Sequence, residues 1–133
     1  MITKPIPYGR QHITDEDIQC VIDALKSDYL TQGPKIKEFE EAFASYVGCK
    51  YAIAVNNATA GLHLAATALD VNLGDKVIVT PLTFAASANC IRFRGGEVVF
   101  CDVEEDTYLM DIKKLSRLLS QSPKAVSYTH LTL

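Results

Sequence analysis

The fold is decided by residues 51–62, which read Tyr-Ala-Ile-Ala-Val-Asn-Asn-Ala-Thr-Ala-Gly-Leu. The first five are a short apolar run without polar alternation, which predicts a buried strand covered on both faces. Asn56 and Asn57 then form a turn, and either side chain could cap a helix. That helix is predicted by apolar residues at helical spacing, namely Leu62, Ala65, Ala66 and Leu69. The stretch therefore predicts a strand that runs directly into a helix.

Such a junction leaves backbone N–H groups free at the positive end of the helix dipole, which favours an anion such as phosphate. The hydroxyl of Thr59 would add a donor. Neither the glycine pattern of dinucleotide-binding folds nor a Walker loop is present. The spacing alone leaves two interpretations open, a phosphate site or a well-capped strand–helix junction.

Two further helices are predicted before this stretch. Thr14 is a typical N-cap, followed by three acidic residues and an apolar stripe that ends near Ser27. Pro34 suits the first turn of the next helix, and Gly48 suits its end. We expect its apolar residues to be buried and its acidic ones to be solvated; the apolar set is Ile36, Phe39, Phe43 and Val47, and the acidic set is Glu38, Glu40 and Glu41.

Alternation of strands and helices continues after residue 62. Strands are predicted at 77–79 and 97–103, a helix at 85–94, and a further helix after the cap residue Asp111. This order implies right-handed crossovers and a parallel sheet, so the fold class is α/β.

Composition sets further bounds. The 133 residues are one domain's worth, and 48% of them are apolar, which is ample for a core. A net charge of −3 argues against a nucleic-acid partner, and no apolar run is long enough to span a membrane. The four cysteines are widely spaced, which indicates half-buried or buried thiols in a reducing, cytoplasmic compartment. The three histidines are too scattered to predict a metal site.

Ligands of parallel α/β sheets gather at the carboxyl ends of the strands. This rule brings together the 56–59 turn, the 81–84 turn and Asp102. Phe84, just past a strand end, is either a core residue or a ring that stacks on a flat cofactor.

Five segments occur in an order that resembles the DegT/DnrJ/EryC1/StrS sugar aminotransferases. They are Tyr-Gly-Arg at 8–10, Ser-Asp-Tyr-Leu-Thr-Gln-Gly-Pro at 27–34, Asn-Ala-Thr-Ala-Gly-Leu-His-Leu at 57–64, Gly-Asp-Lys-Val-Ile-Val at 74–79 and Pro-Leu-Thr-Phe-Ala at 81–85. The resemblance covers residues 5–122. It implies the N-terminal part of the large domain of a pyridoxal 5′-phosphate (PLP) enzyme with the aspartate aminotransferase-like fold, fold type I.

The resemblance also implies roles for residues. Ala58 and Thr59 would hold the cofactor phosphate, and Phe84 would stack on the pyridine ring. The nucleotide sugar or the partner subunit of a homodimer would face Tyr8, Asp28, Tyr29, Leu30 and Thr31. The segments at 6–11 and 30–33 resemble those of one branch of the family. Enzymes of that branch move an amino group from L-glutamate to a UDP-4-keto-6-deoxy-N-acetyl-hexosamine in the biosynthesis of pseudaminic acid.

Members of that family are roughly three times longer than this chain, and their cofactor-carrying lysine follows a motif absent from residues 1–133. We therefore expect an inactive fragment with no catalytic residue of its own. Its parts are an arm, helix and substrate loop (1–33), a partial PLP-binding domain (34–124) and a non-native tail (125–133). The tail resembles a translated sequencing adapter, although it could also hold a fourth strand. Two alternatives stay open, a PLP-dependent sugar dehydratase of the same fold and a non-catalytic α/β domain that binds a phosphate ligand.

Overall fold

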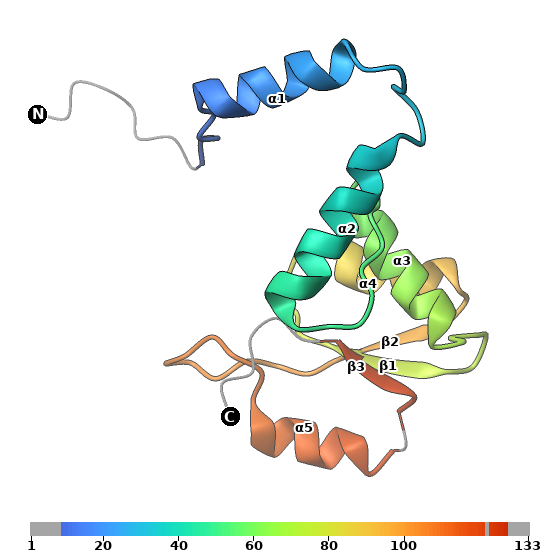
Figure 1. Ribbon diagram of the computed structural model, residues 1–133. Helices are drawn as coiled ribbons and strands as arrows, with labels where there is room; N and C mark the ends of the chain where they lie inside the picture. Colours follow the sequence, from blue (N-terminus) through green and yellow to red (C-terminus); the bar gives the residue numbers. More distant parts are fainter. Residues whose placement is uncertain (1–8, 122, 128–133) are drawn as a thin grey trace, which may run out of the picture. The chain divides into compact units, whose positions relative to one another are not determined.

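The computed structural model describes residues 9–121 and 123–127 (Figure 1). The chain divides into two compact units, Met1–Ala54 and Val55–Leu133. The boundaries predicted at 33/34 and 124/125 separate parts by their expected role, whereas these units are defined by compactness. The predicted boundaries therefore stay predictions. Among the described residues, no helix has both the length and the apolar character needed to cross a membrane.

The first unit contains the two predicted helices. Helix α1 (Asp15–Leu25) begins at Thr14, whose side chain and that of Asp17 cap each other's backbone N–H groups. Helix α2 (Pro34–Val47) starts with proline and ends at Gly48, whose φ of 69° is the left-handed conformation that glycine adopts without strain. Local sequence signals therefore predict both helices and their ends.

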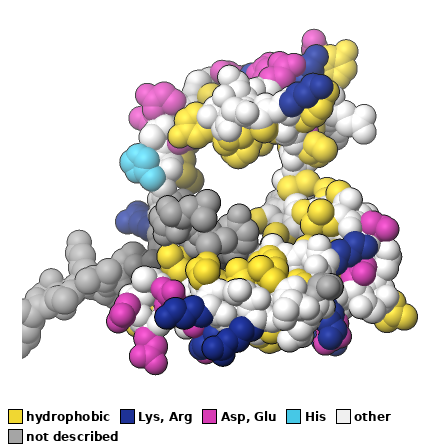
Figure 2. All heavy atoms as spheres, turned by 90° about the horizontal axis from the view of Figure 1, so that it is seen from below, with side chains coloured by type: hydrophobic (Ala, Val, Ile, Leu, Met, Phe, Trp, Pro, Cys, Tyr) yellow, Lys and Arg dark blue, Asp and Glu magenta, His cyan; other side chains and the backbone are white. Residues whose placement is uncertain are grey.

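The apolar face of α2 is not buried, contrary to the prediction. Its four residues, Ile36, Phe39, Phe43 and Val47, are 48–58% exposed, because no element of their own unit covers them in the described part of the chain. Figure 2 shows hydrophobic side chains at the surface among acidic and basic ones. The prediction that Glu40 is solvated is also wrong. Its carboxylate is partly buried and accepts the N–H of Ala54 at 2.8 Å.

The predicted strand at 51–55 does not form. This segment has no regular secondary structure, and its side chains alternate between exposed and half-buried, with Tyr51 74% and Ile53 78% exposed. A strand requires a hydrogen-bonded neighbour, and none of the described residues supplies one. The apolar pattern identified a stretch with strand character, but strand formation depends on a partner.

The second unit is a three-layer α/β structure (Figure 1). Its elements in chain order are α3 (Ala58–Ala68), β1 (Lys76–Val79), α4 (Ala86–Phe93), β2 (Glu97–Phe100), α5 (Ile112–Leu119) and β3 (Ala125–Ser127). The strands are all parallel in the order β2-β1-β3. The predicted α/β class and parallel sheet are confirmed. Strand β3 begins where the sequence predicts a non-native tail; that prediction is not tested, because residues 128–133 lie outside the described ones.

Alternate residues of β1 face two hydrophobic clusters. Val77 and Val79 pack with residues of α3 and α4, and Ile78 packs on the other face with Cys101, Met110 and the apolar side of α5. Two of the four cysteines, Cys90 and Cys101, are buried as expected. The other two, Cys20 and Cys49, are exposed, which corrects the prediction for them.

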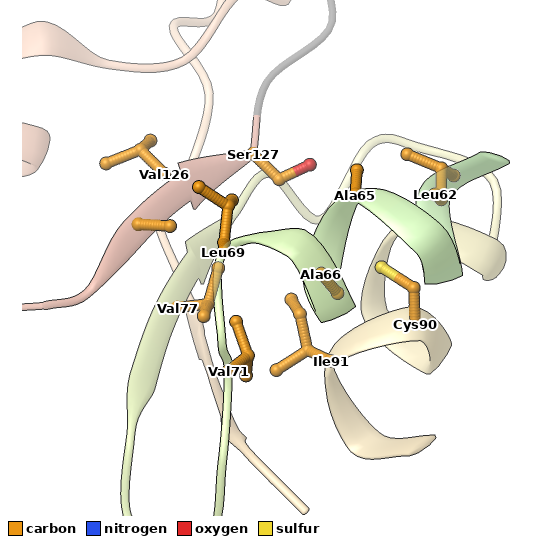
Figure 3. A pocket seen from close by; sticks show the side chains of 11 residues that line it. Leu62, Ala65, Ala66, Leu69, Val71, Val77, Cys90, Ile91, Val126 and Ser127 are labelled. Atoms are coloured by element: carbon orange, nitrogen blue, oxygen red, sulfur yellow. The ribbon is translucent and has the colours of Figure 1, made fainter. Parts of the chain in front are cut away.

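An apolar groove of about 230 Å³ remains beside the first cluster, between α3 and strands β1 and β3 (Figure 3). Its lining includes Leu69 from the end of α3, Ile91 from α4 and Val126 from β3. The cluster on this face of the sheet is therefore open on one side.

Side chains tie the elements together at the amino edge of the sheet, where the strands begin. The guanidinium of Arg94 donates to the carbonyl of Val71 at 3.1 Å and to Asn72 Oδ1 at 3.2 Å, which joins the ends of α3 and α4. Lys124, which precedes β3, donates to the carbonyl of Asp70 and to Asp75 Oδ2, the latter at 3.0 Å. These contacts link β3 to the start of β1.

The tie between Lys124 and Asp75 predicts a pH dependence. Hydrogen bonds from the Lys124 ammonium and the Asn72 N–H hold the pKa of the Asp75 carboxyl below its ordinary value. A lowered folded-state pKa stabilises the fold above the unfolded pKa of about 4, and this contribution is lost as pH falls through the folded pKa. We expect Asp75→Asn to lower the urea midpoint at pH 7 and to have little effect at pH 2.5.

The control is Asp106→Asn, which changes an exposed acid in the loop after β2. Its effect is expected to be small at both pH values. An Asp75→Asn effect that is equally large at pH 2.5 would contradict the assigned role of the ion pair.

Candidate functional site

Chain direction places three predicted features at the carboxyl edge of the sheet. Helix α3 ends beside the start of β1, and Glu97, which starts β2 after α4, donates its N–H to Asp75 O at 2.8 Å at the same amino edge. Because α3 and α4 both end at the amino edge, their N-termini lie at the opposite edge, where β1 and β2 finish. The 56–59 turn, Phe84 and Asp102 therefore share that edge.

The N-terminus of α3 presents free donors. Asn57 is its N-cap, and the amide oxygen of this side chain accepts the Ala60 N–H at 2.9 Å while its carbonyl accepts the Gly61 N–H at 3.2 Å. The N–H groups of Ala58 and Thr59 and the Thr59 hydroxyl have no partner among residues 9–121 and 123–127. Both residues are exposed, and the first turn carries no acid. This donor set, with the positive end of the helix dipole, suits a phosphate dianion.

Phe84 lies in the turn between β1 and α4. Its ring is 78% exposed, and its carbonyl accepts the Ser87 N–H at 3.0 Å in the first turn of α4. The hydroxyls of Thr83 and Ser87, 3.1 Å apart, join the turn to the helix. The interpretation of Phe84 as a core residue is therefore wrong. The exposed ring is free to stack on a flat group.

Asp102 reaches the same edge but belongs to the α5 side of the sheet. Its Oδ2 lies 2.8 Å from Lys114 Nζ, and Asp111 Oδ2 lies 3.8 Å from the same ammonium. The hydrogen bond to Asp102 raises the pKa of Lys114, and the same bond lowers the pKa of Asp102. The ammonium of Lys114 is therefore paired with a carboxylate on the α5 side of the sheet. The sequence analysis did not predict the contact between Lys114 and Asp102. The one local indication of an ion pair at Lys114 is that this lysine follows the cap residue Asp111 by about one helical turn.

The predicted substrate loop lies in the first unit, between α1 and α2. All four of its described candidates, Asp28, Tyr29, Leu30 and Thr31, are exposed. The loop is tightly folded, because a Cβ on Gly33 would lie 2.9 Å from the Tyr29 carbonyl oxygen and Gln32 has a φ of 53°. Tyr8, the fifth candidate, lies outside the described residues.

A comparison with protein families matches residues 11–132 to the DegT/DnrJ/EryC1/StrS aminotransferase family. A relative in Campylobacter jejuni, UDP-4-amino-4,6-dideoxy-N-acetyl-beta-L-altrosamine transaminase, is 44% identical over 118 residues, which are 88% of this chain and 31% of the relative. The chain spans about a third of the length of the curated relatives it matches.

Two solved structures extend the comparison. The PLP form of the putative sugar aminotransferase Spr1654 from Streptococcus pneumoniae is 38% identical with a TM-score of 0.80, and the match covers 84% of this chain and 29% of that one. Helicobacter pylori PseC, an aminotransferase involved in the biosynthesis of pseudoaminic acid, is 31% identical with a TM-score of 0.85, over 92% and 33% of the two chains.

Proposed function

Since the chain belongs to the DegT/DnrJ/EryC1/StrS aminotransferase family, we propose that it forms the cofactor-phosphate site of a nucleotide-sugar aminotransferase. PLP is the cofactor of this family, whose members are solved in PLP and PMP forms. The observation that carries the proposal is the free donor set of Ala58 and Thr59 at the N-terminus of α3.

The proposed division of labour follows from the positions of these groups. The N–H groups of Ala58 and Thr59 and the Thr59 hydroxyl bind the phosphate, and the exposed ring of Phe84 stacks on the pyridine ring. When bound, PLP supplies an electron sink for amino-group chemistry. The chain's own residues anchor and orient it, and a phosphate held by fixed donors limits the rotation of the ring.

The proposed substrates are L-glutamate and a UDP-4-keto-6-deoxy-N-acetyl-hexosamine of pseudaminic acid-type biosynthesis. The support is the name of the Campylobacter jejuni relative, together with the exposed loop 28–31 and Tyr8 as candidates that face the sugar. A homodimer in the cytoplasm is part of the same proposal.

We also propose that residues 1–133 alone transfer no amino group. Lys76 and Lys124 lie at the amino edge of the sheet, opposite the donors of α3, and the ammonium of Lys114 is ion-paired with Asp102 on the α5 side of the sheet. These positions favour phosphate binding over catalysis for this chain by itself. Amino transfer from glutamate to the keto sugar by purified 1–133 would contradict this part of the proposal.

Thr59→Val tests the phosphate role. The probe is 4′-deoxypyridoxine 5′-phosphate, which has no aldehyde and cannot react with surface lysines, and the comparison ligand is 4′-deoxypyridoxine. We expect the unaltered chain to bind the phosphorylated ligand more tightly in equilibrium dialysis. Thr59→Val should weaken that binding about tenfold, because a hydrogen bond to a charged group is lost.

The matched control is Thr67→Val in the same helix, whose hydroxyl donates to the His63 carbonyl near the other end. It should leave binding unchanged. Equal affinity of the unaltered chain for the two ligands would overturn the proposed phosphate site.

A further inference from the structure

Asn57 decides which N–H groups of α3 remain available. It is the only residue in the described chain whose side chain caps α3, and it takes the Ala60 N–H rather than the N–H of Ala58 or Thr59. Its carbonyl takes the next N–H, that of Gly61. The two groups of Asn57 thus satisfy the third and fourth donors of the helix and leave the first two free.

A carboxylate would cap the helix at least as well. Helix α5 is capped in this way by Asp111, whose Oδ1 accepts the N–H groups of Lys113 and Lys114 at 2.8 and 3.0 Å. Asn and Asp are equivalent N-caps in general, and Asp gains further from the helix dipole. Stability of α3 therefore gives no reason to prefer a neutral cap. A charged one, however, would place a negative group beside the donors of Ala58 and Thr59.

We propose that Asn57 is a positioning residue for the cofactor phosphate, an inference that rests on the proposed function. Its neutral amide caps α3 at Ala60 without adding negative charge, and so it directs the phosphate to the N–H pair of Ala58 and Thr59. Asn57 does not itself bind the phosphate in this proposal. It caps the helix and leaves the surface beside the N–H groups of Ala58 and Thr59 without a negative charge.

Two substitutions separate this role from simple capping. Asn57→Ser keeps a neutral cap, and Asn57→Asp keeps the cap but makes it negative. A purely structural role predicts that both variants bind 4′-deoxypyridoxine 5′-phosphate like the unaltered chain. The proposal predicts that Asn57→Ser retains affinity within about threefold, whereas Asn57→Asp loses about tenfold through repulsion of the dianion.

Salt dependence supplies a readout that a structural defect would not mimic. The loss in Asn57→Asp should shrink as ionic strength rises from 0.01 to 1 M, a range in which the screening length falls from about 30 to about 3 Å. Binding of unphosphorylated 4′-deoxypyridoxine should be the same in all variants. Thermal unfolding followed by circular dichroism should show that Asn57→Asp is at least as stable as the unaltered chain.

Gln121→Glu is the matched charge control. It adds the same charge to the same unit after α5, away from the α3 N-terminus, and should not change phosphate-ligand binding. If Asn57→Asp binds the phosphorylated ligand as tightly as the unaltered chain, the positioning role proposed for Asn57 is contradicted. The proposed phosphate site is not affected by that result. If the unaltered chain does not distinguish the phosphorylated from the unphosphorylated ligand, both inferences fall.

Discussion

Ile91→Ala is expected to destabilise the second unit by about 2–4 kcal/mol, which is the range for truncation of a buried isoleucine. Ile91 is 2% exposed and packs in the cluster between the sheet and helices α3 and α4. It also lines the apolar groove beside that cluster. Removal of the side chain therefore joins a new cavity to an existing groove, and the packed elements have few neighbours that can move in to fill it.

The measurement is urea denaturation followed by circular dichroism. Ile112→Ala is the matched control, because it deletes the same atoms from a residue of α5 that is 50% exposed. Its cost should be below about 1 kcal/mol. Equal losses in the two variants would show that the cluster around Ile91 does not hold the unit together.

Ala58→Pro is expected to lower affinity for 4′-deoxypyridoxine 5′-phosphate by about tenfold to a hundredfold, the worth of one hydrogen bond to a charged group. Proline removes the N–H of Ala58 and nothing else that the site uses. The first position of a helix accepts proline, as Pro34 demonstrates in α2. Asn57, with φ −165° and ψ 164°, is already extended, the conformation that a residue before proline favours.

Equilibrium dialysis measures the affinity, and circular dichroism checks that the helix content is retained. Ala58→Gly serves as the control, since it changes the side chain and keeps the N–H. Undiminished binding in Ala58→Pro, with the fold intact, would remove the Ala58 amide from the proposed site.

The features that could be predicted from the sequence are those that depend on neighbouring residues. Thr14 and Gly48 mark helix ends through hydrogen bonds and backbone angles within a few positions. The same holds for the turn before α3, where the sequence left open whether Asn56 or Asn57 is the cap and the structure assigns Asn57. The alternation of strands and helices then places the candidate site at one sheet edge.

The features that could not be predicted depend on distant partners. Arg94 bonds to a carbonyl 23 residues away and Lys124 to a carboxylate 49 residues away, and nothing in the local pattern specifies either contact. The apolar run at 51–55 has strand character, but a ladder needs a second strand that local reasoning cannot supply. Similarly, a helical stripe such as that of α2 states that a face is apolar and does not state what covers it.

The two ties at the amino edge differ in their response to acid. The acceptors of the Arg94 guanidinium, a peptide carbonyl and a side-chain amide, are not ionisable groups. Lys124, by contrast, bonds both to the Asp70 carbonyl and to the Asp75 carboxylate, and the second of these contacts is weakened when the carboxylate is protonated. Acidification should consequently weaken the attachment of β3, an edge strand of the sheet, while the contacts of Arg94 that join the ends of α3 and α4 stay intact.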